Sequence, residues 1–150
     1  MSWTRDRILD RLHEASERFG LNPQQARHIQ RTARRADPAE AFAALFAVFE
    51  REPRPEYGYH DQEYAGRALL AACPPCPLPL KEAIRRALPN WNVSVEQLPL
   101  YFAEVFGKQV ALDALAEVER GDLSERERRA VGVMCFWTEQ HTTEWARTRV

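Results

Sequence analysis

Apolar residues recur at spacings of three and four along almost the whole chain, which is the period of a helix with one buried face. The first segment shows this clearly, because its apolar residues share one face and its charged residues the other. No segment forms a credible strand. The pattern predicts an all-helical protein whose first helix buries Ile8, Leu9, Leu12, Ala15 and Phe19 and ends at Gly20.

Local signals place the helix ends. Asn22-Pro23 and Asp37-Pro38 each combine a capping side chain with a proline at the first helical position. Ser124 with Glu127 predicts a capping box, and Asp61 is a plausible N-cap. A short turn at 94–98 is expected before a helix that begins at Pro99. About eight helices follow from these signals, over 8–19, 23–35, 39–49, 61–72, 80–88, 99–106, 110–120 and 124–141.

The chain length favours a single domain over 1–150, because 150 residues can bury a sizeable core without disulfides or metals. Several helices group as antiparallel pairs at 22–51, 60–88 and 99–120. That spacing predicts a short HEAT-like stack, although the pairs share no clear residue-by-residue repeat. An irregular bundle is the alternative.

Cysteine count and hydropathy bear on the compartment. Three cysteines cannot all pair within one chain, which favours a reducing cytoplasm. The charged N-terminal residues do not resemble a secretory signal, and no run of 18 apolar residues could span a membrane. We expect a cytoplasmic protein with no membrane partner.

Cys73-Pro-Pro-Cys76 has the spacing of a redox pair or of half a zinc site. A redox role needs the pair at a helix N-terminus after a strand, and zinc needs two further ligands. A rigid proline turn with apolar cysteines is the other interpretation. The chain also lacks a glycine-rich phosphate loop, a Gly-x-Ser-x-Gly elbow and a His-Glu-x-x-His motif. We therefore expect no enzyme activity, no cofactor and no metal site.

Charge is distributed unevenly along the sequence. Residues 1–36 contain eight arginines and four acids, whereas the remaining residues are net acidic. Arg27, Arg31, Arg34 and Arg35 would form one basic ridge on a helix, as in a DNA-reading helix. The ridge is a candidate nucleic-acid-binding site. The alternative is a solvated face whose charges meet acids of a neighbouring helix, and the low isoelectric point makes nucleic acid the less favoured partner.

Tyrosines gather in the segment 57–64, together with a histidine and two acids. Tyrosine offers apolar area with a hydroxyl, a mixture that protein interfaces favour. Trp91, between two asparagines, is a second candidate anchor, although Tyr64 and Trp91 could equally pack at helix ends. The candidate protein-binding residues are Tyr57, Tyr59, His60, Asp61, Glu63 and Trp91.

The region 60–120 contains an Asn-Trp-Asn turn at 90–92 and a Leu-Pro helix start at 98–99. In these features it resembles small bacterial helical proteins of the HEAT-like kind, some of which are immunity proteins of secreted-toxin systems. The resemblance implies a non-enzymatic domain that binds and neutralises a toxin. It transfers no functional residue. The leading hypothesis is therefore protein binding, with a nucleic-acid-associated regulator and a small redox or zinc protein as alternatives.

Overall fold

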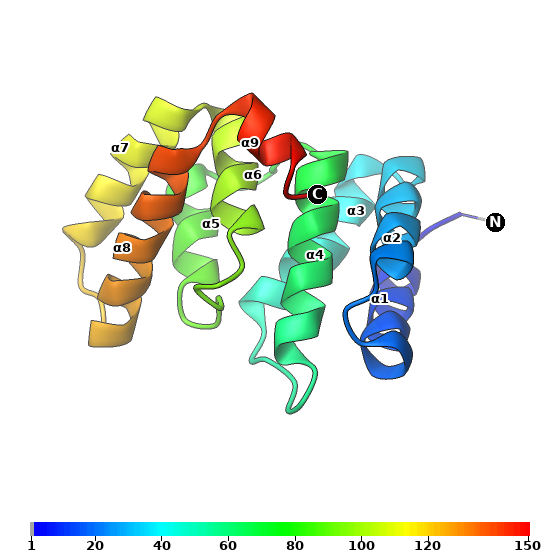
Figure 1. Cartoon of the computed structure of the whole chain (residues 1–150). Coiled ribbons are helices and arrows are strands. Elements are labelled where there is room, and N and C mark those ends of the chain that lie inside the picture. Colours follow the sequence, from blue (N-terminus) through cyan, green and yellow to red (C-terminus); the bar gives the residue numbers. More distant parts are fainter. Residues whose placement is uncertain (1) are drawn as a thin grey trace.

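The computed structural model describes residues 2–150, and in that range the protein is all-helical, as predicted, with nine helices and no strand. Figure 1 shows how they are arranged. Their bounds are α1 Arg5–Phe19, α2 Pro23–Arg35, α3 Pro38–Glu50, α4 Gly58–Ala72, α5 Leu80–Ala87, α6 Gln97–Phe106, α7 Lys108–Glu119, α8 Glu125–Gln140 and α9 Thr143–Arg147.

The capping signals act as the sequence predicts at three helices. The Asn22 side chain accepts hydrogen bonds from the backbone N–H groups of Gln24 and Gln25, and Asp37 accepts one from Ala39. Ser124 and Glu127 form both hydrogen bonds of the capping box. Each side chain satisfies backbone donors that the first turn would otherwise leave free.

Several helix boundaries differ from the prediction, and three of the differences have an identifiable cause. α4 begins at Gly58 rather than at Asp61, because the Asp61 carboxylate binds Arg54 instead of capping the helix. α6 begins at Gln97, so Pro99 lies in the first turn, where its missing N–H costs no hydrogen bond. α8 ends at Gln140, and Thr142 then caps the separate helix α9.

The helices form two layers. α2, α4, α6 and α8 pack side by side in one layer, whereas α1, α3, α5 and α7 follow one another in the second. α1 and α2 form one end of the stack and α7 and α8 the other (Figure 1). The expected hairpin over 60–88 is wrong, because α4 packs mainly on α2, α3 and α6, and α5 on α3 and α7.

The hydrophobic core runs from α1 to α8 between the two layers. At its centre the Phe42 and Phe46 rings stack with centroids 5.0 Å apart, and Phe46 meets Phe102 of α6 edge to face. α3 is buried on most of its circumference, as its nearly all-apolar sequence predicts. The C-terminal segment crosses the top of the layer formed by α2, α4, α6 and α8, which we call the even layer (Figure 1). There Ala146 packs with Leu70 of α4 and Leu100 of α6.

Candidate functional site

The turn between α3 and α4 is held by an ion-pair cluster that joins three segments of the chain. Arg54 Nε donates to Asp61 Oδ2 at 2.7 Å and Arg54 Nη2 to Asp61 Oδ1 at 2.9 Å, a bidentate pair. Arg54 Nη1 donates to Glu17 Oε1 of α1 at 2.5 Å. The Asp61 side chain is only 4% exposed, so Arg54 supplies the charge that makes its burial tolerable.

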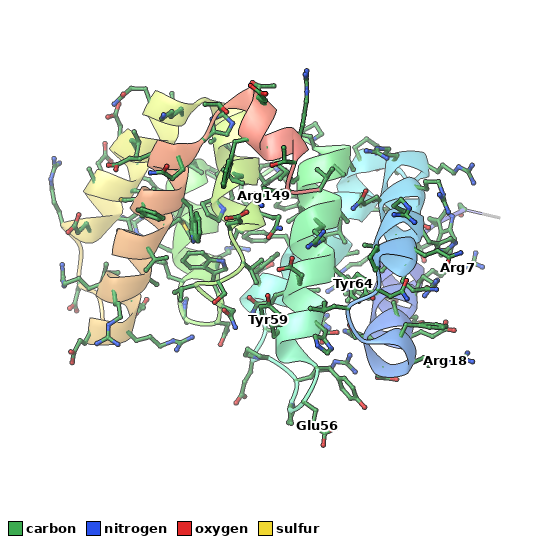
Figure 2. The ribbon with its side chains drawn as sticks, viewed as in Figure 1. Arg7, Arg18, Glu56, Tyr59, Tyr64 and Arg149 are labelled. Carbon is green, nitrogen blue, oxygen red and sulfur yellow. The ribbon has the colours of Figure 1, made fainter. Side chains whose placement is uncertain are left out.

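Backbone geometry also fixes this turn, which we call the α3–α4 corner and define as residues 51–60. Glu56 adopts the left-handed conformation, with φ 69°. A Cβ on Gly58 would lie 2.6 Å from Pro53 Cβ, so only glycine fits there. The Arg54 guanidinium lies 5.0 Å from the centroid of the Tyr57 ring. The corner is therefore a well-defined projection, at the bottom of the view in Figure 2.

Three of the predicted protein-binding residues reach the surface of this corner. The Tyr59 side chain points outward and is 41% exposed, whereas Tyr57 and His60 are half-buried (Figure 2). Burial is the main cause that raises the pKa of the Tyr59 hydroxyl, followed by the charge of Glu63, so this group stays neutral and can donate a hydrogen bond. The corner offers aromatic area with polar edges, as a protein interface requires.

The other three predicted residues lie inside the protein, which corrects their placement on a binding surface. Asp61 is bound by Arg54, and the Glu63 side chain, 10% exposed, accepts a hydrogen bond from Arg67 Nε at 2.8 Å. Trp91 is fully buried, and its Nε1 donates to the Val95 carbonyl at 2.9 Å. The alternative prediction, that Trp91 packs at a helix end, is the one that the structure confirms.

Sequence reasoning missed Arg54, Glu17 and His13. His13 lies with Arg54 and Asp61 at a pocket of about 70 Å³ beside the corner. Burial and the charges of Arg54 and Arg51 lower the pKa of His13 against the opposing effect of Asp61 and Glu17. An arginine between two prolines, seven residues before an acid, was a possible signal, but the part played by Glu17 depends on tertiary packing.

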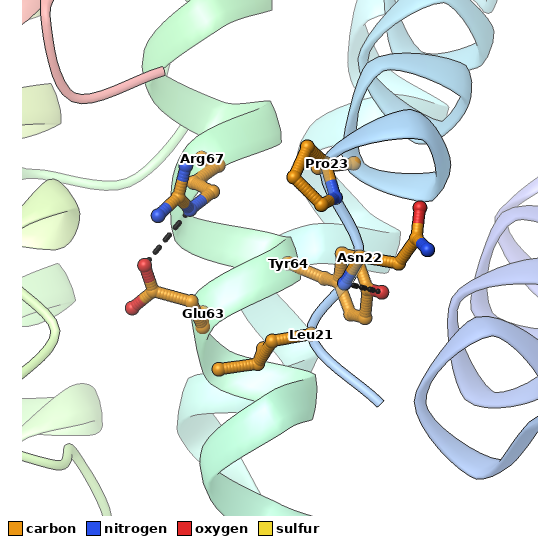
Figure 3. A pocket seen from close by; sticks show the side chains of 7 residues that line it. Leu21, Asn22, Pro23, Glu63, Tyr64 and Arg67 are labelled. Atoms are coloured by element: carbon orange, nitrogen blue, oxygen red, sulfur yellow. Dashed lines mark hydrogen bonds and ion pairs between the residues drawn. The ribbon is translucent and has the colours of Figure 1, made fainter. Parts of the chain in front are cut away.

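A second small pocket, also about 70 Å³, lies where the α1–α2 turn meets α4 (Figure 3). Leu21 and Pro23 line one side, and Glu63 and Arg67 the other. The Tyr64 hydroxyl donates to the Gly20 carbonyl at 2.5 Å and accepts from the Asn22 N–H at 2.9 Å. Since these bonds satisfy the hydroxyl and the pocket holds little more than a few waters, it is a packing feature of the turn.

The basic ridge on α2 is exposed as predicted. Arg27, Arg31, Arg34 and Arg35 are all exposed, and no described Asp or Glu oxygen lies within 4 Å of their guanidinium nitrogens. Arg34 donates only to the Ala71 carbonyl, at 3.4 Å. The exposure of the four arginines fits the solvated face of the alternative interpretation, but the ion pairs with a neighbouring helix that it expected do not form among the described residues. The positive charge also affects His28 on the same helix. Burial lowers the pKa of His28, and the charges of Arg11, Arg31 and Arg35 lower it further.

Cys73 and Cys76 lie after the C-terminal end of α4, and both are free thiols. Burial raises the pKa of both cysteines, and the charge of Glu104 further raises that of Cys73. A helix C-terminus disfavours negative charge, the opposite of the N-terminal setting that activates a thiolate. Tyr101 fixes the proline turn by donating to the Pro74 carbonyl at 2.7 Å. The surroundings fit a structural turn.

The described histidines do not converge with other ligands. Across residues 2–150 no three His, Cys, Asp or Glu side chains are grouped closely enough to hold a metal ion. His141 Nε2 lies 2.9 Å from Glu104 Oε1 of α6. Within the same residues, no helix is both long and apolar enough to cross a membrane.

Comparison of the chain with protein-family models, with curated proteins and with solved structures returned no match.

Proposed function

We propose that this protein is a non-enzymatic protein-binding domain that uses the α3–α4 corner as its contact surface. The observation that carries the proposal is the way in which Arg54 anchors the corner to Asp61 and Glu17. A contact loop that is rigid before binding loses little conformational entropy when the complex forms. The exposed Tyr59 ring supplies the kind of residue that dominates binding energy in protein interfaces.

The two-layer helical arrangement supports a HEAT-like character, since such stacks present surfaces to other proteins. Within this proposal, the partner we favour is a bacterial toxin that the domain neutralises in the cytoplasm. The exposed acids Glu52 and Glu56 belong to the same corner and would complement a basic partner.

The test is co-purification from the native host with the tagged full chain, followed by reconstitution with the purified partner. The double variant Tyr57→Ala/Tyr59→Ala should weaken the reconstituted complex at least tenfold, as loss of a central aromatic does. Val110→Ala is the matched control, because Val110 is also an exposed apolar residue but lies on α7. Equal binding by both variants would show that the corner is not part of the interface. Failure to recover any stoichiometric partner would contradict the proposal as a whole.

A second candidate function rests on the α2 ridge, whose four arginines have no acidic partner among the described residues. A nucleic-acid-associated regulator would use them against phosphates. In that case, retention on DNA or RNA should fall steeply with salt and be lost in Arg31→Glu/Arg34→Glu. The absence of retention at low salt would exclude this function.

A further inference from the structure

The outer face of α8, at one end of the stack, carries an apolar centre between charged positions. Met134 and Thr138 point inward and are buried. On the opposite side Phe136 is 52% exposed. Val93 of the loop between α5 and α6 is 40% exposed, and its carbonyl accepts a hydrogen bond from Trp137 of α8. The exposed positions on this outer face are Glu125, Arg128, Arg129, Gly132, Phe136, Glu139 and Gln140.

The contacts within a single chain do not explain why residue 132 is a glycine. A Cβ built on it would meet no heavy atom within 4 Å, so neither tight packing nor an unusual φ requires glycine here. Glycine weakens a helix interior relative to alanine. In the middle of a helix, one turn before an exposed phenylalanine, it creates a shallow hollow on the helix surface into which an aromatic ring can fit.

The face is complementary to itself. Arg129 and Glu139, and likewise Gly132 and Phe136, are placed symmetrically about Met134. Two copies of α8 can pack antiparallel through their outer faces, about a two-fold axis at the height of Met134 along the helix. Phe136 of each copy then meets Gly132 of the other. The same register brings Arg129 of each copy to Glu139 of the other. A two-fold interface requires this kind of self-complementary patch.

Among residues 2–150, neither Arg129 nor Glu139 has a close side-chain ion pair. Arg129 lies 3.7 Å from Glu125 on its own helix, but both side chains are so exposed, 75% and 93%, that this pair is weak. Glu139 contributes only its backbone carbonyl, to Lys108. Both side chains are free to form the intermolecular pair.

We propose that the protein forms a two-fold homodimer through α8, in which Phe136 of each copy packs on Gly132 of the other. The contact covers the exposed aromatic surface that a lone chain would leave in water. It uses no residue of the α3–α4 corner, so both surfaces can be occupied at once. Because it is built from one helix per chain, the interface is small and the dimer reversible.

Sedimentation velocity of the full chain at rising concentration tests the proposal. A reversible monomer–dimer equilibrium is expected, and Phe136→Glu should abolish it while helix content by circular dichroism stays unchanged. Gly132→Leu should also give a monomer, since its side chain fills the hollow that Phe136 needs. Phe19→Glu is the matched control, because Phe19 is also an exposed phenylalanine but lies on α1 at the other end of the stack, and the dimer should stay intact.

Charge-reversal variants test the register in which the two α8 helices pack. Arg129→Glu alone should weaken the dimer about tenfold, and Arg129→Glu/Glu139→Arg should restore most of that loss. A chain that stays monomeric at every concentration would overturn the proposal. A dimer that survives Phe136→Glu would overturn it as well, and so would a double reversal no tighter than the single one.

Discussion

The guanidinium of Arg54 is shared between two carboxylates, of which only Asp61 is removed from water. Replacing Arg54 by methionine keeps most of the apolar stem but leaves the Asp61 charge buried without its partner. We expect the free energy of unfolding to fall by about 2–3 kcal/mol, less than for a fully buried pair because Arg54 is 30% exposed. Urea denaturation measures the change.

Arg51→Met is the control for that variant, since Arg51 is exposed on the same loop and forms no ion pair among the described residues. It should change stability by less than about 0.5 kcal/mol. Removing both charges, in Arg54→Met/Asp61→Leu, should recover part of the loss. If Arg54→Met is no more costly than Arg51→Met, the corner does not depend on the ion pair.

Two imidazoles are held near arginines, and this sets a pH dependence. Burial and nearby guanidinium groups lower the pKa of His13 and of His28 below the ordinary value. The unfolded chain therefore takes up protons before the folded one as pH falls below about 6.5. Stability should be full above that pH and decline below it, before carboxylates begin to protonate near about pH 4.

Urea midpoints of the wild type measured between about pH 7.5 and about pH 5 should show that decline. The double variant His13→Gln/His28→Gln should have a flatter profile over the same range. Parallel profiles would mean that neither imidazole is the source.

At the scale of the helix, two glycines should respond to alanine with opposite signs. A Cβ on Gly66 of α4 would lie 3.0 Å from both Gln97 Cβ and Val95 Cγ1, and both of these residues are buried. Overpacking should exceed the gain in helix propensity, giving a net loss of about 1 kcal/mol. Gly132→Ala meets nothing and should stabilise the monomer by about 0.5–1 kcal/mol.

Thermal and urea denaturation at low protein concentration, where any dimer dissociates, measure both substitutions. Each variant serves as the control for the other, because the chemical change is identical. Stabilisation by both would mean that α4 and α6 can separate slightly without cost.

Sequence alone predicts helix elements well where a local signal acts within one turn. Asn22, Asp37 and Ser124 cap the helices that they were expected to cap. Asp61 has the same carboxylate chemistry, but its side chain accepts hydrogen bonds from Arg54 instead of from the helix backbone, and α4 begins at Gly58. Only a contact between segments decides which of the two roles an aspartate takes.

The candidate site was harder to predict than the fold. The concentration of tyrosines correctly drew attention to Tyr57, Tyr59 and His60, which do reach the surface. Asp61 and Glu63 look equally polar in the sequence, yet both lie inside, each with its arginine. Spacing within one helix cannot reveal which face meets a neighbour when both faces carry polar groups.

At the scale of the molecule, the C-terminal segment joins helices that are distant in the sequence. Arg149 lies over the Trp145 ring, 3.8 Å from its centroid, and its Nε is 2.8 Å from Glu96 Oε1. The Arg149 carbonyl accepts a hydrogen bond from Gln97 at 3.0 Å, and Ala146 covers Leu70 of α4 and Leu100 of α6. The segment therefore bridges two neighbouring helices of the even layer along one edge.

A chain that stops after Gln140 tests this bridging role. It exposes the apolar cluster at Leu70 and Leu100 and removes Arg149, the partner of Glu96 and of Gln97. The free energy of unfolding should fall by on the order of 3 kcal/mol, while far-ultraviolet circular dichroism loses only the signal of the short α9. Arg147→Ala is the control, because Arg147 is an exposed residue of the same helix and should have little effect. An unchanged urea midpoint for the shortened chain would mean that packing between α4 and α6 suffices without the bridge.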